Sequence, residues 1–168
     1  MMIEIVKRQP EDRAAAALEL FQQAYRAQTQ GLLDLAVTLY KQSIALFPTA
    51  EAYTFLGWTY HFQGKTKEAI EECKNAILID PTFGNPYNDI GAYLIELGEL
   101  DEAVGWLERA IASKRYESYH YPWYNLGRVY AARDLFNKAR QCFEKALAIE
   151  PTYRLASEAL ANIKRLIQ

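Results

Sequence analysis

The sequence predicts an all-α fold built from repeated pairs of helices, because small residues and prolines recur along its 168 residues at nearly constant intervals. Glycines recur 34 and then 36 residues apart, at Gly57, Gly91 and Gly127. Alanines recur in step with them, at Ala36, Ala69, Ala103 and Ala139. Prolines followed by threonine recur too, at Pro48, Pro81 and Pro151. Units in register with one another favour a repeat architecture over an unrelated helical bundle.

Residues 50–83 show one unit most clearly. Two sets of residues spaced three or four apart indicate one face of a first helix and one face of a second. The first set is Leu56, Gly57 and Tyr60, and the second is Ala69, Cys73 and Ala76. The short side chains of Gly57 and Ala69 allow the two helices to approach closely. The stretch 63–65 is expected to turn the chain, and Pro81 to end the second helix.

This pattern, Tyr53-x2-Leu56-Gly57-x2-Tyr60 followed by Ala69, Ala76 and Pro81, resembles the tetratricopeptide repeat (TPR), a helix–turn–helix unit of about 34 residues. The resemblance implies an α-solenoid, in which nine helices stack as a right-handed superhelix and the first helices line a concave face. It also implies a role in binding proteins, as a scaffold or adaptor.

The resemblance implies a tail at 1–10 and a single TPR domain at 11–168. The domain is expected to contain repeats at about 17–49, 50–83, 84–117 and 120–153, a lengthened junction at 113–122 and a capping helix at about 154–166. Its first helix is expected from Pro10 to about Gln30, after an extended stretch at Ile3–Val6. The threonines after the closing prolines are expected to cap the helices that follow, at Thr49, Thr82 and Thr152.

Composition excludes several classes of protein. A net charge of −2 argues against nucleic acid as the main partner, because such binders usually carry a basic surface. No apolar run is long enough to span a membrane, and residues 1–13 do not resemble a secretory signal. Cys73 and Cys142 occupy the same repeat position, so we expect two buried thiols without a disulfide and a cytoplasmic protein.

No pattern in the sequence indicates catalysis. His61 and His120 are the only histidines; His61 has no cysteine or carboxylate at metal-ligand spacing, and His120 lies in the junction. Neither a glycine-rich phosphate loop nor a nucleophile elbow is present. We therefore expect neither an enzyme, nor a cofactor, nor a metal site.

Aromatic residues accumulate where the family geometry places side chains that face the concave groove. We predict that a partner binds there, as a peptide or a helix, on Tyr25, Trp58, Phe62, Asn88, Tyr121, Tyr124 and Arg128. Exposed rings and arginine carry much of the energy at protein interfaces. Phe21, Phe55 and Phe62 could equally pack against neighbouring helices.

Other interpretations remain open at this point. TPR proteins that bind the terminal carboxylate of chaperones carry a Lys–Asn pair on one first helix, and no repeat here has it, so no such binding is expected. The tyrosines of the junction at 113–122 either form a second site or pack on adjacent repeats. The alternative function is a self-assembling homo-oligomer, or an accessory factor of a larger assembly such as a bacterial envelope or pilus. RNA binding through the aromatic residues is a third hypothesis, which the net charge disfavours.

Overall fold

The computed structural model describes residues 9–167, and the all-α fold predicted from the sequence is confirmed within that range. The chain divides into two compact units, one ending at Pro81 and the other beginning at Thr82. The extended stretch expected at Ile3–Val6 lies outside the described residues. Among the helices that are described, none combines the length and the apolar character needed to cross a bilayer.

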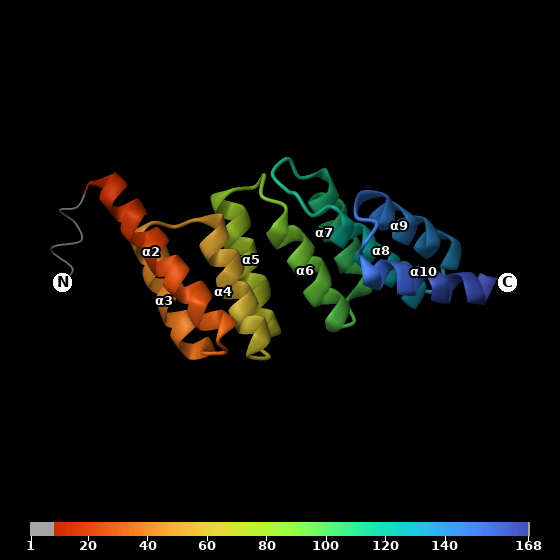
Figure 1. Ribbon diagram of the computed structural model, residues 1–168, viewed down its shortest axis with the longest axis horizontal. Helices are drawn as coiled ribbons and strands as arrows, with labels where there is room; N and C mark the ends of the chain where they lie inside the picture. Colours follow the sequence, from red (N-terminus) through yellow and green to blue (C-terminus); the bar gives the residue numbers. More distant parts are fainter. Residues whose placement is uncertain (1–8, 168) are drawn as a thin grey trace. The chain divides into compact units, whose positions relative to one another are not determined.

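Unit 1 consists of two helix pairs, coloured red to yellow-green in Figure 1. Its helices are α2 (Pro10–Thr29), α3 (Leu33–Leu46), α4 (Ala50–Phe62) and α5 (Thr66–Ile79). The pairs α2–α3 and α4–α5 each pack together, and α3 also packs against α4. Pro10 begins α2 and Glu11 follows it, an order that suits a helix start because proline needs no donor there and acids favour the N-terminus.

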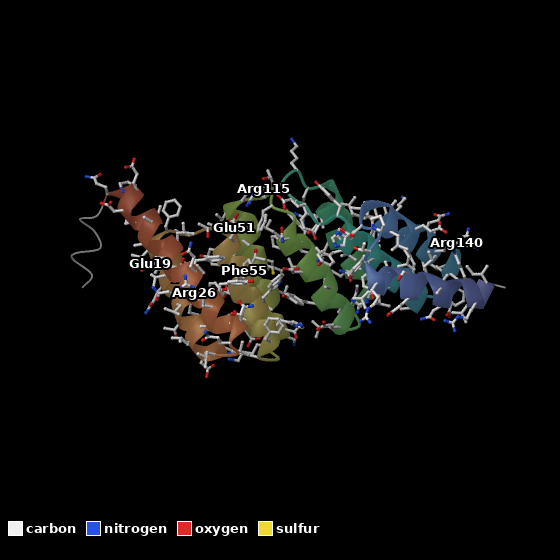
Figure 2. All side chains as sticks on the ribbon, viewed as in Figure 1. Glu19, Arg26, Glu51, Phe55, Arg115 and Arg140 are labelled. Atoms are coloured by element: carbon white, nitrogen blue, oxygen red, sulfur yellow. The ribbon has the colours of Figure 1, made fainter. Side chains whose placement is uncertain are left out.

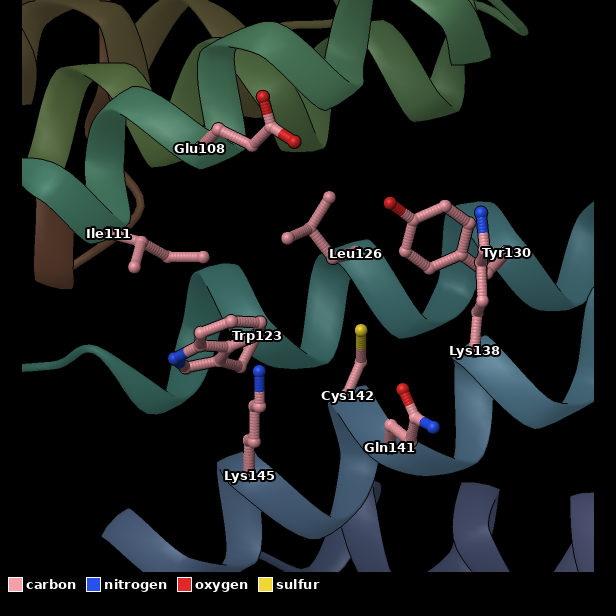
Figure 3. A pocket seen from close by; sticks show the side chains of 9 residues that line it. All are labelled: Glu108, Ile111, Trp123, Leu126, Tyr130, Lys138, Gln141, Cys142 and Lys145. Carbon is pink, nitrogen blue, oxygen red and sulfur yellow. The ribbon is translucent and has the colours of Figure 1, made fainter.

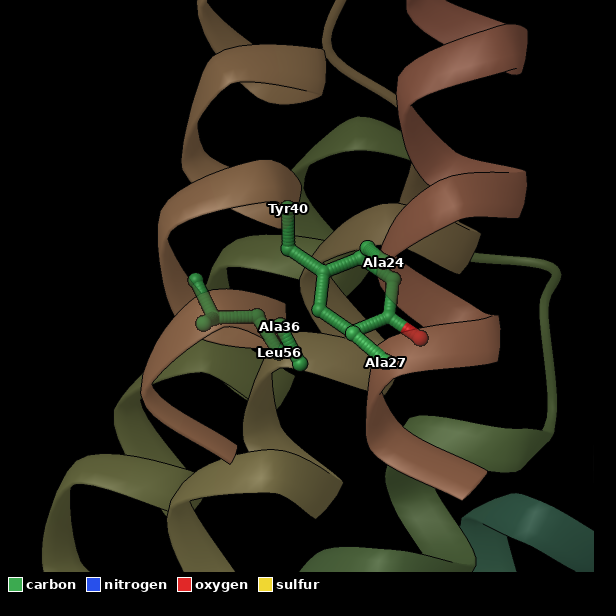
Figure 4. Close-up of a cluster of buried hydrophobic side chains, with 5 residues drawn as sticks. All are labelled: Ala24, Ala27, Ala36, Tyr40 and Leu56. Carbon is green, nitrogen blue, oxygen red and sulfur yellow. The ribbon is translucent and has the colours of Figure 1, made fainter. Parts of the chain in front are cut away.

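The core of unit 1 combines alanines with one large ring. Figure 4 shows a cluster of five side chains from three helices: Ala24, Ala27, Ala36, Tyr40 and Leu56. The alanines let α2 and α3 approach closely, and the fully buried Tyr40 fills the remaining space. The Tyr40 hydroxyl donates a hydrogen bond to Oε1 of Gln28 at 2.8 Å, which satisfies a polar group that burial would otherwise leave unpaired.

Unit 2 consists of two further helix pairs and a closing helix. Its helices are α6 (Asn85–Glu96), α7 (Leu100–Ala112), α8 (His120–Ala132), α9 (Phe136–Ile149) and α10 (Arg154–Ile167). The pairs are α6–α7 and α8–α9, and α8 also packs against both α6 and α7. The last helix packs on α9, where Ile163 joins a cluster with Ala139 and Phe143. Ile163 is buried while Leu155 and Leu166 on the same helix are exposed.

The glycines of the repeat pattern lie where two helices of a pair come closest. A Cβ atom added at Gly91 would lie 2.5 Å from Cδ2 of Leu107, and one added at Gly127 would overlap the ring of Phe143. Both contacts would be closer than those that real Cβ atoms make. The close helix approach predicted from the spacing of small residues is therefore confirmed in unit 2.

The predicted threonine caps hold at one position and are wrong at two. The side chain of Thr49 accepts a hydrogen bond from the backbone N–H of Ala52 at 3.1 Å, and so caps α4. Thr82 does not cap α6, because its carbonyl oxygen accepts from the N–H of Arg115 at 3.0 Å and the helix begins only at Asn85. Thr152 instead turns its hydroxyl to Oε1 of Glu150 at 2.5 Å.

Candidate functional site

The predicted partner-binding residues divide between the two units. Unit 1 carries Tyr25, Trp58 and Phe62, and unit 2 carries Asn88, Tyr121, Tyr124 and Arg128. Within unit 1 they come from α2 and α4, and within unit 2 from α6 and α8. Each unit therefore presents its own set of side chains.

Phe55 of α4, labelled in Figure 2, contacts the rings of Phe21, Tyr25, Tyr40 and Trp58. Its ring centroid is 5.7 Å from that of Tyr25 and 5.0 Å from that of Trp58, so it links two of the predicted residues. Phe21 also contacts it, at 5.2 Å in an edge-to-face arrangement. Phe21 and Phe55 both pack against the core cluster, so packing is the outcome for these two rings. Tyr25 remains 47% exposed beside them.

Phe62 lies apart from this arrangement, at the last residue of α4. Its side chain is 62% exposed, and its ring contacts that of His61 at 6.1 Å. An exposed phenylalanine at a helix end is available to a partner, but the geometry does not group it with Tyr25 and Trp58.

In unit 2, three rings form what we call the tyrosine cluster: Tyr121, Tyr124 and Tyr153. The ring of Tyr153 lies 5.5 Å from that of Tyr121 and 5.2 Å from that of Tyr124, at interplanar angles of 89° and 80°. Tyr121 is 42% exposed, whereas Tyr124 is half-buried against Phe143. The guanidinium of Arg128 lies 6.0 Å from the Tyr124 ring, within the range of a cation–π contact.

Beside the tyrosine cluster runs a chain of side-chain hydrogen bonds, which we call the amide chain. Arg128 donates to Oδ1 of Asn125 at 3.1 Å, and Asn125 donates to Oδ1 of Asn88 at 3.0 Å. Asn88 in turn donates to Oδ1 of Asp89 at 3.5 Å. Asn88 and Asn125 are only 8% and 6% exposed. Asn88 therefore lies beneath the surface, and the amide chain positions Arg128 from below.

Burial and neighbouring groups change the acidity of the rings. Burial, and then Tyr124 and Tyr121, raise the pKa of Tyr153 to about 12, against an opposing effect of Arg128. Burial also lowers the pKa of His120, whose ring lies 5.1 Å from that of Tyr153, although Glu150 opposes this shift. The guanidinium of Arg128 supplies a positive charge beside the tyrosine cluster.

The junction tyrosines mostly pack within unit 2. Tyr116 is buried against Gly84, where an added Cβ would lie 2.5 Å from the ring. The Tyr119 hydroxyl donates to the carbonyl oxygen of Ser113 at 2.6 Å. Arg115, labelled in Figure 2, pairs its backbone with that of Phe83 in a parallel bridge and lies 4.1 Å over its ring. The lengthened junction is therefore tied to the start of its own unit.

Tyr153 is the functional candidate that the sequence did not single out. It stands two residues after Pro151, and Phe83 stands at the same offset after Pro81. The recurrence of an aromatic residue two positions after a closing proline is the sequence signal that could have identified Tyr153. The orientation of the Tyr153 ring toward α8 depends on where α10 begins. The wrong prediction that Thr152 caps α10 hid this dependence.

The surfaces present aromatic rings and, in unit 2, the guanidinium of Arg128, which suits the recognition of a polypeptide. Over residues 9–167, no three His, Cys, Asp or Glu side chains gather as metal ligands. Cys73 and Cys142 are both buried and are not joined in a disulfide, as predicted.

Comparison with known proteins identifies the repeats. Models described as "Tetratricopeptide repeat" match residues 50–83, 87–115 and 120–153, which together make up more than half of the chain. A curated relative from Hordeum vulgare, the probable UDP-N-acetylglucosamine–peptide N-acetylglucosaminyltransferase SPINDLY, is 29% identical over 130 residues. The match covers 74% of this chain but 14% of that protein, so the chain spans only a small part of its relative.

Solved structures resemble the chain over most of its length. The crystal structure of MamA is 29% identical with a TM-score of 0.71, and the match covers 84% of this chain and 82% of that one. The crystal structure of PilW, described as a widely conserved type IV pilus biogenesis factor, is 21% identical with a TM-score of 0.82, covering 90% and 70%. At that identity the likeness to PilW shows the fold alone.

Proposed function

Because the chain belongs to the tetratricopeptide repeat family, which is generally a protein–protein interaction module and is itself non-catalytic, we propose that it acts as an adaptor for a partner protein. The partner offers a peptide or a helical segment, which binds on the aromatic surfaces of the first helices. Tyr121, Tyr124 and Arg128 of α8 carry most of the contact. Tyr25 and Trp58 supply a separate surface on unit 1, and Phe62 supplies a further exposed ring at the end of α4.

The tyrosine cluster is the single observation that supports this proposal most. Packing alone does not require Tyr121 to be 42% exposed beside two further rings and a guanidinium. Tyrosine and arginine are the residues most enriched in interface hot spots, because they combine a rigid apolar surface with polar ends. Arg128, held by Asn125, offers its remaining donors to a carbonyl or a carboxylate of the partner.

Site-specific crosslinking in a lysate of the native organism tests the proposal. One variant carries a photoreactive benzoyl-phenylalanine at Tyr121, and the control carries it at Leu78 of α5, which is 81% exposed and outside both surfaces. We expect a distinct protein adduct at position 121 that is absent at 78 and disappears when Arg128→Ala is added. Equal adducts at both positions, or an adduct at position 121 that persists when Arg128→Ala is added, contradict the proposal.

The self-assembling module is the alternative, in which this chain is its own partner within a larger envelope or pilus assembly. PilW shares the fold, which leaves such a role open as a hypothesis without supporting it further. Light scattering over a concentration series separates the two. A monomer at all concentrations favours the adaptor, and an oligomer whose Tyr121 adduct is a second copy of the chain favours self-assembly.

A further inference from the structure

A second candidate site lies within unit 2, between α7, α8 and α9 (Figure 3). These helices line a cavity of about 330 Å³ that is open to solvent, which we call the α7–α9 cavity. Its walls include Ile111, Trp123, Leu126 and Cys142, and Leu126 and Cys142 are only 3% and 6% exposed. A cavity of this size with an apolar interior and a few polar groups is typical of a site for a small molecule.

The α7–α9 cavity is distinct from the tyrosine cluster, although α8 contributes to both. Tyr121, Tyr124 and Arg128 are spaced three and four residues apart, and the cavity residues of α8 have the same spacing, at Trp123, Leu126 and Tyr130. The second set is displaced by two positions, which is about 200° around a helix. The two sets therefore occupy opposite sides of α8, so a ligand in the cavity does not compete for the tyrosine cluster.

Charge is distributed unevenly along the cavity. Lys145 holds its Nζ 4.0 Å from the centroid of the Trp123 ring, and Lys138 holds its Nζ 5.5 Å from that of Tyr130. The lysines are seven residues apart on α9, which separates them by roughly 10 Å along the helix. Among the described residues, neither lysine forms an ion pair.

The two ends of the cavity differ in what opposes the positive charge. Glu108 lies close enough to the Tyr130 phenol to contribute to its raised pKa, after burial and Cys142, so a carboxylate is present at the Lys138 end. At the other end, the exposed side chain of Lys145 extends over the ring of Trp123. The end formed by Trp123 and Lys145 therefore combines an apolar wall with a cation that has no carboxylate of its own.

We propose that the α7–α9 cavity binds a small apolar carboxylate. The apolar body lies against Trp123, Ile111 and Leu126, and the carboxylate pairs with Nζ of Lys145. A charge-assisted hydrogen bond of this kind is stronger than a neutral one. This site is independent of the adaptor function, since it uses none of the residues of the tyrosine cluster.

Three compounds of equal chain length test the proposal on the full chain: octanoate, octanamide and octylamine. Calorimetry measures their binding, and mass spectrometry measures the rate at which N-ethylmaleimide alkylates Cys142, with the fully buried Cys73 as internal reference. We expect octanoate to bind and to slow alkylation of Cys142 as it fills the cavity. Octanamide and octylamine should bind about tenfold more weakly or not at all, because each loses the charged hydrogen bond.

Charge reversal locates the carboxylate. Lys145→Glu should weaken octanoate binding by about tenfold or more, while Lys164→Glu on the exposed face of α10 leaves it unchanged. Both positions are on the surface, so neither variant should affect folding. The proposal is overturned if octanoate neither binds nor protects Cys142, if octanamide binds equally well, or if Lys145→Glu binds octanoate like the unmodified chain.

Discussion

The side-chain amide of Asn125 donates a hydrogen bond to Oδ1 of Asn88 at 3.0 Å, joining α8 to α6 across the interior of unit 2. Thirty-seven residues of sequence separate the two asparagines, and both are buried. On one side the bond continues to Arg128 and on the other to Asp89. Because these hydrogen bonds link side chains of α6 and α8, the position of Arg128 depends on how the two repeats pack together.

Replacement of Asn125 by alanine should destabilise the protein, because it leaves the buried Oδ1 of Asn88 without this donor. We expect the free energy of unfolding to fall by about 1–3 kcal/mol, measured by urea denaturation. Asn162→Ala is the matched control, since Asn162 is exposed and accepts only from Arg165 on its own helix. It should change stability by less than about 0.5 kcal/mol. Equal effects of the two substitutions would contradict a structural role for the amide chain.

The close helix approach gives a second prediction. Gly127→Ala should destabilise the protein by about 1–3 kcal/mol, because the new methyl group overlaps the buried ring of Phe143. Gly105→Ala in the middle of α7 should instead stabilise it by about 0.5–1 kcal/mol, since no atom lies within 4 Å of its added Cβ and alanine favours helix. Thermal or urea unfolding measures both. Stabilisation by both substitutions would show that Gly127 is not a packing contact.

The repeat spacing predicted these packing contacts because a glycine or an alanine at a helix crossing lets the two helices approach closely. Gly127 and Ala139 could therefore be assigned from sequence alone. Asn88 could not, because its burial depends on Asn125 in the next repeat rather than on its own surroundings. Tyr153 was not singled out, because its place in the site depends on contact with Tyr124 of α8, which is distant in the sequence. The predicted cap at Thr152 was wrong, because its hydroxyl bonds to Glu150 instead.

The acidity of Tyr153 predicts how stability depends on pH. Its pKa is about 12 in the folded chain against an ordinary value of 10.0, so folding favours the neutral phenol. The contribution of this group is fully present below pH 10.0 and is lost between pH 10.0 and about 12, because the unfolded phenol ionises first. The titratable groups that act on it are Tyr121, Tyr124 and Arg128.

Tyr153→Phe isolates this contribution from those of Tyr40, Tyr116 and Tyr130, whose pKa values are also raised. Urea unfolding of both proteins near neutral pH and again between pH 10.0 and 12 gives the comparison. We expect the unmodified chain to lose more stability than Tyr153→Phe over that interval. An equal loss in both proteins would mean that the folded state does not shift the ionisation of Tyr153.

The central proposal is that the rings of Tyr121 and Tyr124 and the guanidinium of Arg128 on α8 bind a partner polypeptide. Its most direct test is the capture of the partner that the Tyr121 adduct identifies, using the chain with Tyr121→Ala and Arg128→Ala together. We predict that capture is lost while circular dichroism and the melting temperature stay close to those of a matched variant, Leu78→Ala with Lys164→Ala. Capture that persists in the α8 variant at the level of this control would contradict the claim.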